Sequence, residues 1–182
     1  ENINSILICQ YHRIGDVFLI APVLRSLKKR YPQAHIILLC CKGAEKLSRD
    51  LKFADEVIGV EVPWTNWDWS LIKWIKARSF ARHFGKRDID IAIDFKGDLR
   101  NSWFLWHVRS KMSLGYTDTG GSFFYTHPQL SPMGVHQTER SLRLISHLGC
   151  DSIMLDEKEF NFKDQGAIVF HAGGNDPRRA WP

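Results

Sequence analysis

Short apolar runs alternate with segments of helical periodicity along this chain, and this alternation constrains the fold more than any other feature. Four apolar runs have the length of buried strands: residues 5–9, 35–40, 56–60 and 89–94. Helical spacing of apolar residues follows each run, at residues 14–31, 44–51, 67–84 and 99–108. This order predicts an α/β fold with a Rossmann-like, mostly parallel sheet and helices on both faces.

The later part of the chain continues the pattern less regularly. We expect a fifth strand at 113–116, a long loop at 117–134, a helix at 137–148 and a sixth strand at 167–171. A polar stretch at 151–165 separates the last two elements. We therefore predict a first domain over 1–160, and a linker with the start of a second, truncated domain over 161–182.

Composition excludes several classes of protein. The 182 residues are 44% hydrophobic and 25% charged, which excludes disorder and coiled coil. No apolar run reaches the roughly 18 residues that a membrane-spanning helix needs. A net charge of +5 favours anionic partners, such as phosphate groups, nucleic acid or an anionic membrane surface. We read the four cysteines, which lack metal-ligand spacing, as free thiols and expect a cytoplasmic protein.

Ligands bind parallel sheets at the carboxyl ends of strands, so the loops there hold the candidate site residues. In the loop after the first strand, Asp16 is a candidate general base, with Arg13 and His12 as anion contacts. The alternative is that Asp16 only caps the following helix and that the two basic residues are solvated. The sequence lacks GxGxxG, P-loop, HExxH and CxxC motifs, so neither a dinucleotide cofactor nor a metal site is expected.

Basic residues follow the later strands as well. Lys96 and Arg100 come after the fourth strand and could clamp a phosphate or carboxylate; the alternative is ordinary surface charge. Arg140 is a further candidate anion contact, or one member of an intrahelical ion pair. Gly173, Gly174 and Arg179 form a candidate phosphate cradle, or a flexible interdomain loop.

Tryptophans and cations gather between residues 63 and 82. This composition suits a membrane interface or a lipid-bearing acceptor. It equally suits a helix that packs on the sheet and has a basic outer face. No RNA-binding signature accompanies it, so nucleic acid is not expected as a partner.

Three segments occur in order that resemble glycosyltransferase family 9, the ADP-heptose lipopolysaccharide heptosyltransferases: ILICQYHRIGDVFLIAPVLRSLKKRYPQAHI, DIAIDFKGDLRNS and VFHAGGNDPRRAWP. A fourth, HQTERSLRLISHLG, is similar to the helix beside the interdomain linker of that family. The second segment departs from the family motif, because Asn101 stands between Arg100 and Ser102.

The resemblance implies the first half of a GT-B glycosyltransferase, with an acceptor-binding domain followed by a nucleotide-sugar-binding domain. It implies inverting transfer of heptose from ADP-heptose to the Kdo/heptose inner core of lipopolysaccharide, with Asp16 as general base. Arg13, Lys96, Arg100 and Arg140 would contact the acceptor, and Gly173, Gly174 and Arg179 the donor. Neither a metal nor a cofactor is implied, and the site would face the cytoplasmic surface of the inner membrane.

Two other interpretations remain open. The chain could be a non-enzymatic lobe that binds an anionic glycolipid or a membrane surface, or a GT-B transferase that uses another nucleotide sugar. Since most of the donor domain is absent from these 182 residues, we expect the chain alone to have little or no transferase activity.

Overall fold

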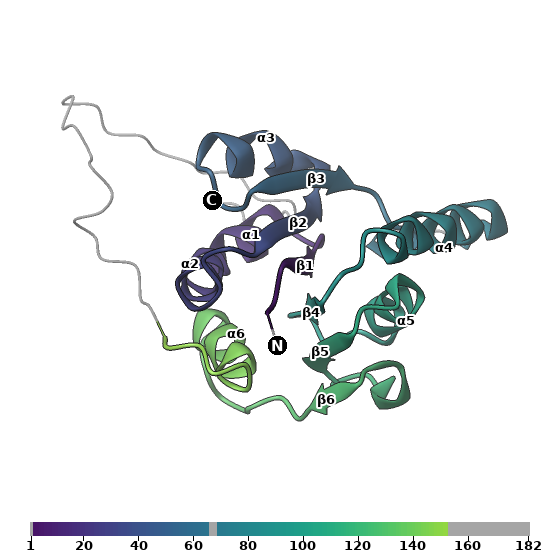
Figure 1. Ribbon diagram of the computed structural model, residues 1–182. Helices are drawn as coiled ribbons and strands as arrows, with labels where there is room; N and C mark the ends of the chain where they lie inside the picture. The colour runs from purple at the N-terminus through teal and green to yellow at the C-terminus, as the bar shows by residue number, and fades with distance from the viewer. Residues whose placement is uncertain (1, 66–68, 153–182) are drawn as a thin grey trace, which may run out of the picture.

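The computed structural model describes residues 2–65 and 69–152. These residues form a six-stranded, all-parallel sheet in the order β3-β2-β1-β4-β5-β6 (Figure 1). The strands are β1 Ser5–Gln10, β2 His35–Cys41, β3 Glu56–Val60, β4 Ile91–Asp94, β5 Met112–Tyr116 and β6 His127–Gln129. The predicted α/β class with a parallel sheet is confirmed.

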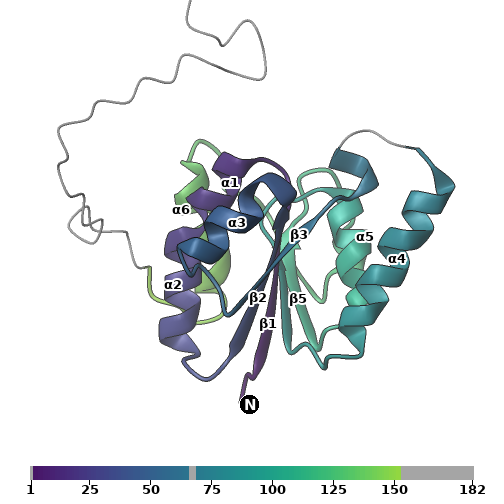
Figure 2. The ribbon, with the colours of Figure 1, turned by 90° about the horizontal axis from the view of Figure 1, so that it is seen from above.

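Helices cover both faces of the sheet (Figure 2). One face carries α1 Ile14–Leu19, α2 Ala21–Arg30, α3 Lys42–Asp50 and α6 Gln137–Ser146. The other carries α4 Leu71–Gly85 and α5 Leu99–Val108, with the 3-10 turns η1 Pro63–Thr65 and η2 Ser122–Phe124. None of the helices in the described ranges is long and apolar enough to span a bilayer.

The core explains why the central strands read as continuous apolar runs. Ile6 and Ile8 of β1 belong to the cluster under α1, α2 and α6, whereas Leu7 and Cys9 belong to the cluster under α4 and α5. A strand buried on both faces needs apolar side chains in both directions, so its sequence does not alternate.

The structure divides the predicted helix at 14–31 into α1 and α2. The division falls at Ile20, whose backbone (φ −92°, ψ 1°) is not helical, and Pro22 lies in the first two positions of α2. Proline lacks an amide hydrogen and crowds the preceding turn, so it suits a helix start and not a helix interior.

The predicted loop at 117–134 contains one further strand. β6 pairs in parallel with β5, with Leu114 opposite His127 and Tyr116 opposite Gln129. The sequence of β6 is His-Pro-Gln, which carries no apolar pattern, and an edge strand tolerates proline because one side needs no partner. The strand predicted at 167–171 and the end of the first domain at 160 lie outside the described residues.

Candidate active site at the switch point of the sheet

The strand order reverses between β1 and β4. The chain leaves β1 through α1 and α2 toward β2, and leaves β4 on the opposite face through α5 toward β5. The two strands lie side by side with Cys9 opposite Asp94 (Figure 1). In α/β proteins ligands bind at the carboxyl ends of such a strand pair, where the connections diverge, and we call this end of β1 and β4 the crevice. Both loops singled out in the sequence therefore meet at this crevice.

The loop after β1 presents Asp16 from the first turn of α1. Arg13 occupies the N-cap position without a side-chain hydrogen bond to the helix, so the capping role considered for Asp16 is not the one found. Nε2 of Gln10 donates a 3.3 Å hydrogen bond to the carbonyl oxygen of Asp16. Arg13 is exposed and Asp16 is partly exposed, so both side chains are accessible to solvent.

His12 lies among the charges of both loops. Its pKa falls from 6.5 to about 4, chiefly because the ring is largely buried and then because Lys96 and, more weakly, Arg100 repel a second positive charge. The carboxylates of Asp98 and Asp16 act in the opposite direction. His12 is therefore neutral near pH 7 and marks the point where these four charged side chains converge.

Three consecutive residues at the end of β1 have buried polar atoms without a hydrogen-bond partner in the described part of the chain. These atoms are Oε1 of Gln10, the hydroxyl of Tyr11 and Nδ1 of His12. Buried polar groups in folded proteins are nearly always paired, so unpaired groups call for an explanation. Gln10 and His12 lie at the switch point, where a polar ligand could pair with them, whereas Tyr11 packs in the core cluster under α4 and α5.

Asp94 organises the loop after β4 from beneath. Its carboxylate accepts hydrogen bonds from the backbone amides of Lys96 (3.1 Å) and Gly97 (3.0 Å). Nδ2 of Asn101 and the hydroxyl of Tyr125 each donate a further bond of 2.8 Å. Burial raises the pKa of Asp94 although all four donors act to lower it. Asp94 thus holds the loop in shape and does not face the crevice.

Arg100 is held in place by the N-cap residue of α5. Asp98 accepts bonds of 2.8 Å from the backbone amide and from Nε of Arg100, and its second oxygen pairs with the guanidinium. Burial acts to raise the pKa of Asp98, but the bonds to Arg100 outweigh it and lower that pKa. The exposed Lys96, by contrast, projects its ammonium group from the loop.

Arg140 of α6 contacts the same loop, and its guanidinium is used in hydrogen bonds within the protein. Its Nη1 donates to the carbonyl oxygen of Phe95 at 2.9 Å, its Nε donates to Oγ of Ser131 at 2.6 Å, and it pairs with Asp118. The guanidinium also lies 4.4 Å from the ring centroid of Tyr116. The intrahelical pair on α6 is Glu139 with Arg143, and Arg140 has no part in it.

The crevice therefore joins most of the candidate acceptor residues. Asp16, Lys96 and Arg100 lie near enough to His12 to affect its charge, and Arg13 adjoins His12 in the chain. Arg140 reaches the site only through backbone oxygens of the β4 loop. Gly173, Gly174 and Arg179 lie outside the described residues. Sequence reasoning missed Tyr125, which falls in a stretch predicted as loop and carries no signal of its own. It also missed the unpaired Oε1 of Gln10.

Metal ligation has no support in the described ranges. They contain no group of three or more His, Cys, Asp or Glu side chains placed to hold a metal ion. The polar groups in the crevice are instead cations and single carboxylates, which suit an anionic ligand with an exchangeable proton.

Comparison with known proteins places this crevice in a wider context. No sequence-family profile and no curated protein matches the chain. Solved structures do match. The E. coli heptosyltransferase WaaC with ADP-2-deoxy-2-fluoro heptose has a TM-score of 0.68 at 19% identity, covering 84% of this chain and 50% of that one.

Two further structures agree. E. coli ADP-heptose LPS heptosyltransferase II has a TM-score of 0.62 at 16% identity, covering 77% of this chain and 39% of that one. A glycosyltransferase of family 9 from Veillonella parvula DSM 2008 has a TM-score of 0.71 at 18% identity, covering 98% and 56%. The chain thus spans about half the length of the structures it matches, over their N-terminal part. It has the fold of a lobe of a GT-B glycosyltransferase, as found in these heptosyltransferases and in the family 9 enzyme.

Proposed function

We propose that this chain is the acceptor-binding lobe of an inverting glycosyltransferase of the lipopolysaccharide heptosyltransferase type. The observation that carries the proposal is the adjacency of β1 and β4 at the switch point, whose loops hold Asp16, Lys96, Asp98 and Arg100 near enough to His12 to affect its charge. The fold shared with heptosyltransferases supports the reaction class. The resemblance of the opening segment to that family supports Asp16 as its base.

The chemistry assigned to the crevice is proton removal from an acceptor hydroxyl. An inverting transfer needs one carboxylate near the attacking oxygen, and Asp16 is offered by the first turn of α1. Arg13, Lys96 and Arg100 supply positive charge for a phosphorylated inner-core acceptor, which is a strongly anionic sugar lipid.

The donor in this proposal is ADP-heptose. WaaC has been solved with ADP and with an ADP-heptose analogue, which supports a nucleotide sugar as the donor here. Gly173, Gly174 and Arg179 would contact its diphosphate. Because basic side chains offset the charge that develops on the leaving diphosphate, the mechanism we propose requires no metal ion.

Asp16→Asn tests the role of the carboxylate on the native gene product. We expect the variant to lose a hundredfold or more in turnover, on the order of what general base catalysis contributes, with acceptor binding unchanged. Asp50→Asn, an exposed carboxylate on α3, is the matched control and should retain full turnover. The intact mass of that gene product shows whether a donor lobe belongs to the same polypeptide.

The outcomes separate the three functions considered. Heptose transfer that is inhibited by ADP and abolished by Asp16→Asn supports the proposal. Inhibition by UDP and not by ADP would show that the donor is a UDP sugar and not ADP-heptose. If the Asp16→Asn variant still binds glycolipid and no form of the protein transfers a sugar, the protein is a non-enzymatic binding lobe.

A further inference from the structure

The outward face of α4 begins with an apolar patch. Leu71, Ile72 and Ile75 are 73%, 65% and 58% exposed, and Trp69, just before the helix, is 76% exposed. Leu71 and Ile75 are one turn apart and Ile72 is three residues before Ile75, so the three side chains are neighbours on the helix surface. Single exposed apolar residues are normal, but a contiguous group marks an interaction surface.

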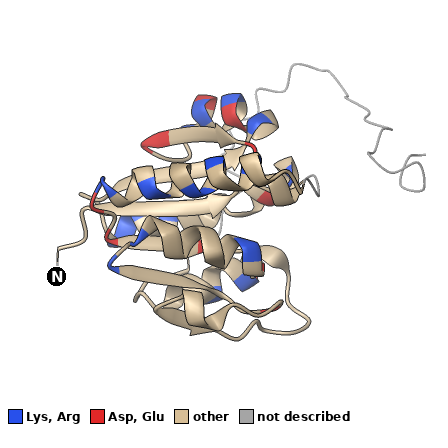
Figure 3. Ribbon diagram, turned by 90° about the vertical axis from the view of Figure 1, so that its right-hand side faces the viewer, with Lys and Arg blue, Asp and Glu red and all other residues tan. Residues whose placement is uncertain are grey.

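The rest of this face is basic. Residues 69–87 contain six Lys and Arg and no Asp or Glu. Figure 3 looks at the α4 side of the molecule and shows the basic residues spaced along the helix. All six are exposed, and four of them continue from the apolar patch toward the end of α4: Lys76, Arg78, Arg82 and Lys86.

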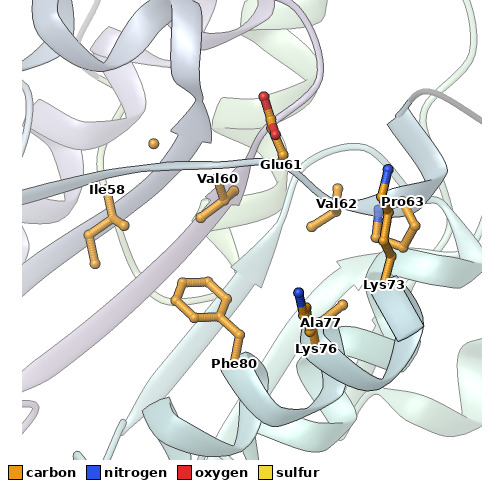
Figure 4. A pocket seen from close by; sticks show the side chains of 10 residues that line it. Ile58, Val60, Glu61, Val62, Pro63, Lys73, Lys76, Ala77 and Phe80 are labelled. Atoms are coloured by element: carbon orange, nitrogen blue, oxygen red, sulfur yellow. The ribbon is translucent and has the colours of Figure 1, made fainter. Parts of the chain in front are cut away.

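A hollow lies beside this face. A cavity of about 420 Å³ separates β3 from α4, and its apolar wall consists of Ile58, Val60, Val62, Ala77 and Phe80 (Figure 4). Lys73 and Lys76 line it from α4, and Glu61, which pairs with Lys42 at 3.1 Å, lines it from the opposite side. The cavity is at the β3 edge and not at the switch-point crevice, so it belongs to the α4 surface.

The apolar patch is firmly connected to the crevice. Helix α4 starts at the edge of the sheet where the strands end (Figure 2). Trp64 of η1 is buried, packs on Trp74 of α4 with ring centroids 5.2 Å apart, and bonds Asn101 at 2.8 Å. Its carbonyl oxygen also accepts a 3.5 Å bond from Arg100. A partner that binds the apolar patch therefore has a fixed orientation relative to the candidate site.

We propose that this face of α4 docks on the surface of an anionic lipid bilayer. Trp69, Leu71, Ile72 and Ile75 enter the headgroup region, and the basic residues beyond them contact lipid phosphates. An apolar group followed by cations, with no acid among them, is complementary to such a surface. The proposal is independent of the transferase chemistry, and it would bring the crevice to the membrane on which a lipid-linked acceptor lies.

Vesicle cosedimentation of the purified chain tests the proposal. We expect binding to vesicles made of equal parts phosphatidylcholine and phosphatidylglycerol, and little binding to phosphatidylcholine alone. Leu71→Ser with Ile75→Ser should weaken the partition coefficient about tenfold or more, because two exposed apolar side chains are lost from the interface. Arg78→Gln with Arg82→Gln should weaken it by about fivefold for each cation removed, and added salt should do the same.

Matched variants on the other face of the sheet control for folding and for general charge. Leu47 and Leu51 are 46% and 47% exposed at α3, so Leu47→Ser with Leu51→Ser also removes exposed apolar area, although less of it, without touching α4. Lys29→Gln with Lys46→Gln removes the same charge as the arginine pair. The apolar control should change the partition coefficient by no more than about twofold. The charge control should change it by no more than about fivefold.

A second experiment measures insertion of Trp69 into the bilayer separately from electrostatic binding to its surface. Brominated lipid should quench tryptophan fluorescence in the unmodified chain, and Trp69→Phe should remove most of that quenching. Equal binding to both kinds of vesicle would overturn the proposal, as would binding that the Leu71/Ile75 variant leaves intact. A concentration-dependent dimer that the same variant dissociates, without vesicle binding, would assign the face to a second copy of the chain.

Discussion

Nε1 of Trp64 donates a 2.8 Å hydrogen bond to Oδ1 of Asn101, and Nδ2 of the same Asn101 donates one of 2.8 Å to Asp94. The hydroxyl of Tyr125 completes this hydrogen-bond network by donating a 2.8 Å bond to the second oxygen of Asp94. All of these side-chain bonds are buried. One carboxamide therefore joins the segment before α4 to the loop that forms one wall of the crevice.

Asn101→Ala should lower the free energy of unfolding by about 2 kcal/mol, because it leaves the Trp64 indole buried without a partner and removes one of the two hydrogen bonds to Oδ1 of Asp94. Urea unfolding followed by tryptophan fluorescence measures the change. Asn2→Ala, at an exposed position, should change it by less than about 0.5 kcal/mol. Equal midpoints for the two variants would show that the network adds nothing to stability.

Gly97 turns the loop after β4 with a φ of +75°, and a Cβ there would lie 3.0 Å from Cβ of Tyr116 and 2.9 Å from Oδ2 of Asp118. Gly97→Ala should therefore cost about 1–2 kcal/mol for the left-handed backbone and a further 1–3 kcal/mol for the close contacts. Gly134, with a φ of +71° and no atom within 4 Å, isolates the first of these costs. Denaturant unfolding of both variants gives the difference, and identical losses would contradict the packing argument.

The sequence was sufficient to predict the sheet, because the pattern of its strands follows from burial. Strands β1 and β2 are enclosed on both faces, so they read as apolar runs, and parallel order follows from the intervening helices. The strand β6 left no such trace. It lies at the edge with a polar sequence, and its pairing with β5 is decided by the tertiary structure.

Side-chain partners within the site were less predictable. Asp16, Lys96 and Arg100 were expected at one sheet edge, and β1 and β4, whose loops hold them, do lie side by side. That Asn101 bonds Trp64, 37 residues earlier in the chain, could not be inferred, since its sequence position only suggested a departure from a family motif. The target of a long side chain depends on what the fold places within its reach.

His12 should make the stability of the protein depend on pH. Its pKa is about 4 in the folded chain and near 6.5 when unfolded, because burial and then Lys96 disfavour the charged ring. The folded state binds this proton more weakly, so the stabilisation is complete above pH 6.5 and is lost as the pH falls toward 4. The full effect is at most about 3 kcal/mol.

His12→Gln isolates this effect from the acidic groups that titrate in the same range. Between pH 6.5 and 4 the unmodified chain should lose more unfolding free energy than the variant. An NMR titration of the His12 ring should give a midpoint near 4. A midpoint near 6.5, with parallel stability curves for the two proteins, would show that the ring is solvated and does not lie between the two loops.

Arg140 offers a direct test of whether a candidate acceptor contact is instead a structural residue. Its side chain is 11% exposed and ties the β4 loop to Ser131 and Asp118, so Arg140→Ala should cost about 3 kcal/mol of unfolding free energy. Arg140→Lys should recover little of it, because an ammonium cannot reproduce the forked contacts of the guanidinium.

Arg143→Ala, one turn along the same helix, removes a solvent-exposed pair with Glu139 and should cost less than about 0.5 kcal/mol. Urea unfolding ranks the three variants, and acceptor titration on each separates stability from binding. If Arg140→Ala keeps its stability but loses acceptor binding, Arg140 is an acceptor contact. Lost stability with binding retained by the folded fraction would assign it to the framework that holds Lys96 at the crevice.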